Sequence, residues 1–113
     1  MKNILIPKFY KMYKWNVEEL KIQVGIIFKL CRLRKGLSQF QVAIEVGLSK
    51  DYIGRIERGE TNPTIEIIVN ICNFLELDIN QVVTKENESQ LATIKLEILE
   101  LEAKLKNQNK KKS

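Results

Sequence analysis

The sequence predicts an all-α protein made of short helices. Apolar residues recur at spacings of three and four along most of the chain, which is the period of helices packed on one side. Serine, threonine and asparagine stand before these runs and glycines follow them, as at helix starts and ends. No segment alternates with period two for long enough to indicate a strand, apart from a weak candidate at residues 2–6. The short linkers favour one packed helical unit.

The first two helices are delimited by their capping residues. Asn16 precedes a run that can continue to Lys35, and the glutamate three residues after it completes a capping-box pattern. Ser38 and Gln41 form a second capping box, so a second helix begins there and ends at Gly47. Three more helices follow, from Ser49 to Gly59, from Thr64 (or Asn62, with Pro63 in the first helical position) to about Leu75, and from Ile79 to Val83.

The apolar faces of these helices form the expected core. In chain order the faces are Val24, Phe28 and Cys31; Val42, Ala43 and Val46; Tyr52, Ile53 and Ile56; and Ile65, Ile68, Cys72 and Leu75. Because both cysteines belong to these faces, we expect buried, reduced thiols and no disulfide.

Residues 85–107 are expected to form a separate amphipathic helix of coiled-coil type, followed by a basic disordered tail at residues 108–113. Its apolar seam steps by three and four through Leu91, Ile94, Ile98, Leu101 and Leu105. This pattern is short and therefore marginal for a free-standing coiled coil. Glu97 and Glu102 would repel each other in a parallel pair, whereas an antiparallel pair matches them with lysines. We expect the seam to form a dimer or partner interface, or to pack on the protein's own body.

Length and charge narrow the classes of function. The 113 residues fit one domain with extensions, the first of them at residues 1–20. The net charge is +5, with bases concentrated between residues 25 and 63 and acids in excess between residues 86 and 105, so only the middle is expected to face a polyanion. No apolar run approaches the ~20 residues of a membrane span, and no secretion signal is evident. We therefore expect a cytoplasmic protein with no membrane partner.

The residue types that most enzymatic chemistry uses are missing. The chain has no histidine, which removes the commonest general base and metal ligand. Its two distant cysteines cannot make a structural zinc site by themselves. Neither the glycine-rich phosphate loop nor the dinucleotide-binding pattern occurs. The sequence therefore predicts no enzyme, no metal and no cofactor.

The stretch RLRKGLSQFQVAIEVGLSKDYIGRIERGETNPT, residues 32–64, resembles the lambda-repressor-like, Cro-type helix-turn-helix domain of the XRE family. The matching positions are Gly25, Arg32, residues 36–39, Val42, Ala43, residues 47–49, Ile53, residues 56–59, Asn62 and Pro63. The ending ICNFLELDINQVV is also similar to that of the family. The resemblance covers about residues 24–83, and it implies a five-helix DNA-binding domain at residues 21–84 between the two extensions.

The resemblance implies that the third helix lies in the major groove of DNA. The implied base-contacting positions are Ser49, Lys50, Asp51 and Arg55, with Arg58 on the same side of the helix. Arg55 can bond O6 and N7 of guanine, and Lys50 can reach guanine or a phosphate. Asp51 can accept a hydrogen bond from the amino group of cytosine.

The same resemblance assigns positioning roles to residues around this helix. Gln39, at the start of the second helix, and Thr61 with Asn62, after the third, are expected to hold phosphates. Arg32 and Glu57 are expected to form a partly buried ion pair that ties the first helix to the third. We interpret this pair as structural, because loss of one partner would leave a poorly solvated charge.

The resemblance implies a sequence-specific DNA-binding transcriptional regulator, acting as a homodimeric repressor on a palindromic operator of double-stranded DNA in the bacterial cytoplasm, and so associated with the nucleoid. One alternative is an antitoxin or antagonist-binding module that binds a protein partner through apolar surface. Another is a non-specific nucleoid binder, which would show salt-dependent binding without sequence preference. The sequence does not identify the operator or any inducer.

Some apolar residues stand where the family usually has polar ones. They are Ile26, Leu30 and Leu33 on the first helix, Phe40 and Ile44 on the second, and Ile67 and Phe74 on the outer side of the fourth. So much exposed apolar surface is unusual on a monomer. We expect it to be covered by residues 6–15 and the C-terminal helix, or by a dimer or protein partner. Glu76 occupies a helix end where the family commonly has glycine.

Overall fold

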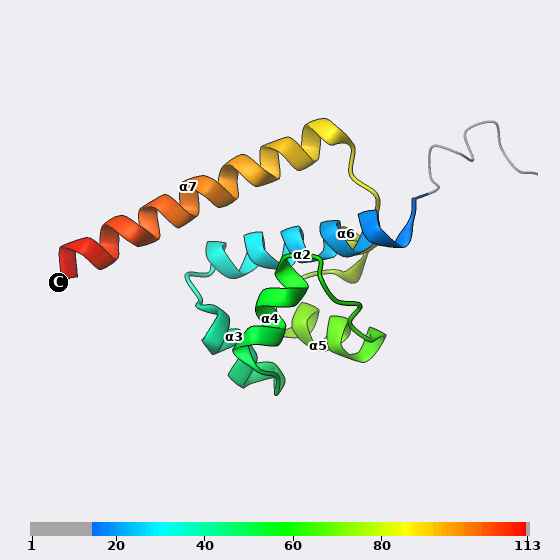
Figure 1. The fold of residues 1–113 in the computed structure, drawn as a ribbon, viewed down its shortest axis with the longest axis horizontal. Coiled ribbons are helices and arrows are strands. Elements are labelled where there is room, and N and C mark those ends of the chain that lie inside the picture. Colours follow the sequence, from blue (N-terminus) through cyan, green and yellow to red (C-terminus); the bar gives the residue numbers. More distant parts are fainter. Residues whose placement is uncertain (1–14, 113) are drawn as a thin grey trace, which may run out of the picture.

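Six helices follow one another in the computed structural model, which describes residues 15–112, with side chains described to Asn109 (Figure 1). They are α2 (Val17–Arg34), α3 (Gln39–Val46), α4 (Lys50–Glu57), α5 (Ile65–Leu75), α6 (Ile79–Val83) and α7 (Glu88–Lys112). The all-α prediction is confirmed, since the described residues contain no strand. The strand candidate at residues 2–6 lies outside them.

The capping residues fix the helix starts as predicted. The side chain of Asn16 accepts a hydrogen bond from the backbone of Glu19 at 2.8 Å, and Ser38 forms a complete capping box with Gln41. Thr64 caps α5, so the alternative start at Asn62 is excluded. Each side-chain cap satisfies an amide that has no partner within the helix.

Two helices have a left-handed residue at the C-cap itself, and Gly36 and Gly59 adopt the same conformation just beyond α2 and α4. Gly47 has φ 72°, which glycine adopts at little cost and which turns the chain sharply from α3 into α4. Glu76 ends α5 with φ 59° although it has a side chain. The end of α5 therefore keeps the left-handed conformation without the glycine usual in the family. For a residue with a Cβ atom this conformation costs about 1–2 kcal/mol.

The main core lies where α2, α3, α4, α5 and α6 meet. Its buried members are Val24, Ile27, Phe28, Val42, Ala43, Ile53, Ile56, Ile71, Cys72, Leu75 and Val82. Both cysteines are free thiols, and burial raises their pKa, which leaves them protonated at neutral pH. This agrees with the thiols predicted, although Cys31 is only half-buried.

The predicted face of α5 was wrong at several positions. Ile65 is 77% exposed because it is the first residue of the helix and points away from the body, and Ile71 is buried in its place. Ile67 and Phe74 were expected on the outer side, yet both are half-buried and pack against the main core. The reason is that α5 contacts α2, α3 and α6 at once, so it buries a wider face than one stripe.

A second, smaller core joins α7 to α2. Leu30, Leu33 and Ile98 are buried in it, with Ile26, Ile94 and Leu101 packed around them. Figure 1 shows α7 lying along α2 and running in the same general direction. Burial of three such side chains contributes roughly 5–8 kcal/mol by transfer estimates, before the entropy of ordering the helix is subtracted.

Ion pairs lie on both sides of this apolar contact. Arg34 donates two hydrogen bonds to Glu97, at 2.6 and 2.7 Å, and Lys29 lies 3.1 Å from Glu102. The bond from Arg34 holds the pKa of Glu97 below its usual value. These charges align α7 on α2, although partly exposed pairs contribute little to stability on their own.

The helix seam was expected to form a dimer or partner interface or to pack on the protein's own body, and in this structure it packs on the body. Of its residues, Ile98 is buried, Leu91, Ile94 and Leu101 are half-buried, and Leu105 remains exposed. The stripe of α2 that was expected to need a cover is covered by α7. Phe40 and Ile44 stay 58% and 61% exposed among the described residues, and residues 6–14, the other expected cover, lie outside those residues.

A disordered tail was expected at residues 108–113, but α7 continues to Lys112. Lysine and glutamine, which are frequent in this segment, are good helix formers. The predicted helix boundary near residue 107 and the tail from residue 108 were therefore wrong as far as Lys112.

One buried amide holds the linker between α6 and α7. Gln23 is 2% exposed, and its side-chain nitrogen donates to the carbonyl oxygens of Val82 at 3.0 Å and Thr84 at 2.8 Å. Its side-chain oxygen accepts a bond from the backbone of Glu86 at 2.9 Å. Three backbone groups far away in sequence thus depend on one side chain, which fixes the direction in which α7 leaves the domain.

Replacing Gln23 by Leu is expected to lower the free energy of unfolding by about 2–4 kcal/mol, because buried backbone groups lose their partners. Urea unfolding followed by circular dichroism measures this. Gln108→Leu, a similar change at an exposed position on α7, should alter stability by less than about 0.5 kcal/mol. Equal effects of the two changes would show that Gln23 does not hold the linker.

Candidate nucleic-acid interface

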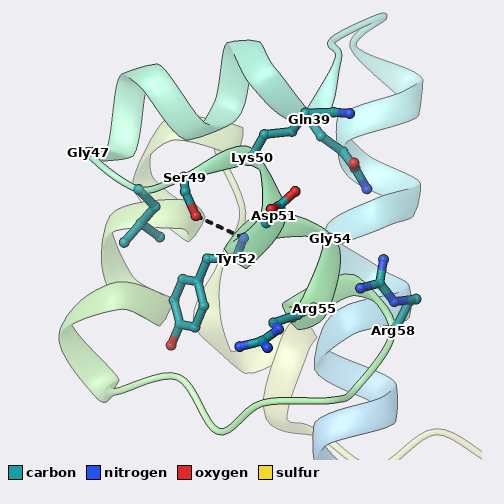
Figure 2. Close-up of a pocket in the computed structure, with 10 residues that line it drawn as sticks. Gln39, Gly47, Ser49, Lys50, Asp51, Tyr52, Gly54, Arg55 and Arg58 are labelled. Atoms are coloured by element: carbon teal, nitrogen blue, oxygen red, sulfur yellow. Dashed lines mark hydrogen bonds between the residues drawn. The ribbon is translucent and has the colours of Figure 1, made fainter.

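The helix pair α3–α4 is held together at a close corner. Ala43 is almost fully buried, and the amide of Leu48 donates to its carbonyl oxygen at 2.9 Å, just after the turn at Gly47. A larger side chain at Ala43 would push the two helices apart. Ser49 then caps α4 by accepting a hydrogen bond from the backbone of Tyr52 at 3.1 Å (Figure 2). The start of α4 is therefore fixed by local contacts.

The other end of α4 is held by the predicted ion pair. Arg32 of α2 donates to both carboxylate oxygens of Glu57, at 2.6 and 3.0 Å, and both residues are buried. A third nitrogen of the same guanidinium donates to the carbonyl oxygen of Leu37 at 2.8 Å. The pair thus links α2, the α2–α3 linker and the end of α4 in one geometry.

Gln39 belongs to the same network. Its side-chain nitrogen donates to Glu57 at 2.9 Å, so one of its two amide hydrogens is already used inside the protein. Gln39 nevertheless lines the outer surface of α4 (Figure 2), and its oxygen and its other amide hydrogen have no hydrogen-bond partner among the described residues. The predicted phosphate contact would therefore come from a side chain that is held in place by the ion pair.

Gly25 shows why α2 can approach α4 so closely. A Cβ placed at this position would overlap the backbone carbonyl oxygens of Ile56 and Glu57. Backbone atoms cannot move aside as a flexible side chain can, so any larger residue would separate the two helices. This residue belongs to the family resemblance, but the sequence alone did not reveal what it contacts.

The outer side of α4 is an open depression of about 860 Å³. Its lining residues are Gln39, Gly47, Leu48, Ser49, Lys50, Asp51, Tyr52, Gly54, Arg55 and Arg58 (Figure 2). All the predicted positions on α4, together with Gln39 and Arg58, are thus brought onto one surface. Thr61 and Asn62 lie in the loop that follows, outside this lining, and are half-buried and exposed respectively.

Three charged side chains on this surface are free to contact a ligand. Lys50, Asp51 and Arg55 are exposed, and none of them forms an ion pair with another described residue. Because α4 is a regular helix, Asp51 and Arg55 are one turn apart on the same side. The surface therefore offers two cations and one anion at fixed spacing.

Arg58 differs from these three because it is already paired. It donates to both carboxylate oxygens of Glu60, at 2.9 and 3.2 Å, and these bonds hold the pKa of Glu60 below its usual value. Glu60 follows the helix, so no helical spacing rule indicated the contact. Glu60 engages two of the five N–H donors of Arg58, so a phosphate would meet a guanidinium whose charge is partly balanced by this carboxylate.

Four lining residues were not among the predicted contacts: Gly47, Leu48, Tyr52 and Gly54. Tyr52 was assigned to the core, and it does pack there, but its ring also forms part of the depression, with the hydroxyl group at the outer end (Figure 2). Leu48 also lines the depression. The half-buried ring of Tyr52 contacts the core with one part and lines the depression with another. Helical spacing assigns a residue to one side only, so it predicted the core contact and missed the surface.

Other site types find no support in the described part of the chain. Residues 15–112 hold no group of three cysteine, aspartate or glutamate side chains arranged for a metal ion. No helix within the same range is long and apolar enough to cross a membrane.

Comparison with known proteins gives the family. The family model described as helix-turn-helix matches residues 28–82. A Sinorhizobium fredii protein named "Uncharacterized HTH-type transcriptional regulator y4dJ" is 31% identical over 75 residues, which make up 66% of this chain and 97% of that protein. The chain belongs to the XRE-type helix-turn-helix family. The relatives are named HTH-type transcriptional regulators, and family and relatives together point to a DNA-binding regulator that is no enzyme, as predicted.

Other XRE-type relatives are longer than the matched region. The HTH-type transcriptional regulator SlrR of Bacillus subtilis is 39% identical over 64 residues, covering 56% of this chain and 42% of SlrR. The regulator SinR of the same species is 28% identical over 68 residues, covering 59% of this chain and 61% of SinR. The chain thus spans about two fifths of SlrR and three fifths of SinR. No solved structure matches it significantly.

In this XRE-type domain, removing either member of the pair Arg32–Glu57 should cost about 3–5 kcal/mol of unfolding free energy, since the remaining charge stays buried without its partner. Arg32→Met and Glu57→Leu test this singly by urea unfolding. The double variant should lose clearly less than the sum of the two single losses. Losses that simply add would show that the two charges do not depend on each other.

Proposed function

We propose that this chain is a sequence-specific transcriptional repressor that binds a palindromic operator as a homodimer, with α4 in the major groove. The observation that carries the proposal is the set of unpaired charges on the outer side of α4, on a helix held firmly at both ends. A helix of this size fits the major groove, which is about 12 Å wide. The hydrogen-bonding groups of the bases are exposed in that groove.

The three free side chains supply distinct recognition chemistry. Arg55 can donate two hydrogen bonds to O6 and N7 of guanine, a geometry that no other base offers. Lys50 can reach a neighbouring guanine or phosphate. Asp51 can accept from the amino group of cytosine, and it disfavours any register that would place a phosphate against it. The surface therefore supports discrimination between sequences, which a purely basic surface would not.

The surrounding polar groups support positioning on the DNA backbone. Gln39, Ser49 and Arg58 belong to the lining of the depression, and Thr61 and Asn62 follow in the loop. The first amides of α3 and α4 also lack helical partners and can donate to phosphates. Such contacts fix the register without reading sequence. Binding should therefore weaken as salt concentration rises.

Dimeric binding is supported by the symmetry of DNA itself. A single α4 contacts only a few base pairs, which is too little to define a site in a genome, and two copies on a palindrome double the contact. Repression is the simpler output, since occupation of a promoter is enough to block it. The names of SlrR and SinR describe them as transcriptional regulators, in agreement with this proposal.

A second function is favoured by one surface feature. Phe40 and Ile44 lie one turn apart on α3 and are largely exposed, and neither belongs to the depression on α4. An exposed apolar pair is suited to a protein partner. The alternative is therefore an antitoxin or antagonist-binding module. A protein that binds there and competes with DNA would support it, and Phe40→Ser with Ile44→Ser should then abolish that binding but leave DNA binding intact.

Selection of bound sites from random DNA should yield a short, approximately palindromic sequence. In Arg55→Ala the preference should relax at one position in each half-site, corresponding to about 1–3 kcal/mol of discrimination. Lys106→Ala, which removes an exposed base on α7, serves as the matched control and should leave the selected sequence unchanged. A selected sequence that Arg55→Ala does not alter would exclude Arg55 as a base reader.

Gly54 lies on the outer side of α4, either because glycine lets the helix backbone approach the bases closely or because glycine is simply tolerated there. The variant Gly54→Ala should distinguish these two interpretations. A Cβ there would lie 3.0 Å from a nitrogen of Arg58, whose exposed side chain can move, so the fold should tolerate it and gain up to about 1 kcal/mol of helix stability. If the helix backbone lies close to the bases, DNA affinity should fall roughly tenfold, or about 1.4 kcal/mol. Unfolding and DNA titrations measure the two effects, and unchanged affinity would mean that glycine is merely tolerated.

A further inference from the structure

Helix α7 has a second apolar side that the fold does not use. Ala92, Leu96, Leu99 and Ala103 step by four, three and four along it, and we call them the outer stripe. Leu96 and Leu99 are 60% and 62% exposed. At about 100° per residue the outer stripe lies nearly opposite the seam that packs on α2. Figure 1 shows the body of the protein on one side of α7 only.

The protein's own packing does not require this stripe. A surface helix that covers one neighbour needs one apolar side, and α7 already has it in Ile94, Ile98 and Leu101. Leucines at the spacing of the outer stripe instead follow the period of about 3.5 residues by which two helices pack along each other. The small residues Ala92 and Ala103 at its ends would allow close approach of a second helix.

We propose that the outer stripe pairs with the outer stripe of a second copy of this chain, with the two α7 helices side by side and running in the same direction. This inference rests on the proposed dimeric function and names the surface that forms the dimer. Leu96 and Leu99 then pack against the same residues of the partner, so the contact is closed by a two-fold axis and does not propagate into a fibre.

Charge complementarity selects this orientation. Lys95 and Glu100 flank the outer stripe on its two sides, both are exposed, and neither forms an ion pair with another residue between 15 and 112. In a parallel pair in register, Lys95 faces the partner's Glu100, and symmetry repeats the contact. In an antiparallel pair, Lys95 would face the partner's Glu102. That position is already engaged, since Glu102 lies 3.1 Å from Lys29 in its own chain.

The size of the stripe predicts a weak contact in solution. Two leucines and two alanines cover less than the ~800 Å² per partner of a standard stable interface. On an operator, however, two bound domains are held near each other, and the high effective concentration converts a weak contact into cooperative binding. The dimer should therefore be partial in free protein and complete on DNA with two half-sites.

Sedimentation equilibrium of the full chain tests whether the outer stripe forms a dimer. Concentrations up to about 1 mM are used, because weak contacts of this kind are populated in that range. Wild type should self-associate, and Leu96→Glu with Leu99→Glu should be monomeric throughout, with unchanged helix content by circular dichroism. Phe40→Glu with Ile44→Glu is the matched control, because it places two glutamates on equally exposed apolar residues of α3. A monomeric wild type, a dimer that survives the change at Leu96 and Leu99, or a dimer abolished by the change at Phe40 and Ile44 would each overturn the proposal.

A charge exchange tests the orientation. Lys95→Glu and Glu100→Lys should each weaken self-association, and the chain that carries both should associate as wild type does. An antiparallel pair would not be restored by the double exchange, and that result would overturn the parallel arrangement.

Binding to a duplex with one half-site separates this inference from the proposed function. There the Leu96→Glu, Leu99→Glu chain should bind as tightly as wild type, while losing cooperativity on the full palindrome. If wild type itself fails to bind DNA specifically but still dimerises through the outer stripe, the proposed function fails and the interface stands.

Discussion

The bidentate contact between Arg32 and Glu57 is the interaction on which the candidate reading surface depends. Helix α4 has eight residues, and a helix shorter than ~12–15 residues is marginal alone, so tertiary contacts must define its orientation. A buried ion pair need not exceed an apolar contact in stability, but it has one geometry where apolar packing has several. The pair also holds Gln39 through Glu57, and Gly25 lets the two helix backbones meet closely enough for the pair to form. A change in this contact would alter the direction of α4 before it altered the helix itself.

The sequence predicts the helix starts, the corner at Gly47 and the ion pair because each depends on local capping chemistry or on positions shared with the family. It fails where the cause is tertiary. The face of α5 was misassigned because IEIIVNICNFL is apolar on nearly all sides, and only its neighbours decide which residues are buried. The contact between Arg58 and Glu60 was missed because it spans a helix end. The seam of α7 could not be assigned from spacing, since the apolar stripe on α2 and a partner helix offer the same kind of surface.

Helix α7 has one side that completes the domain and another that is proposed to form the dimer. One of its sides completes the domain by covering Leu30 and Leu33, and the buried amide of Gln23 sets the direction in which the helix leaves α6. The opposite side then projects its leucines in a fixed direction relative to α4. A rigid α7 would set the distance between two α4 helices in a pair, and therefore the spacing of half-sites. The inward side is structural, and the outward side is proposed to determine assembly.

The central claim is that the outer side of α4, oriented by Arg32 and Glu57, is the surface that reads DNA. The most direct measurement is the change in backbone amide NMR shifts when a duplex of the selected half-site is added. The account predicts the largest changes from Gly47 to Arg58 and in the loop at residues 61–64, and only small changes along α7. Changes concentrated on α5 or α7, with α4 unaffected, would contradict it.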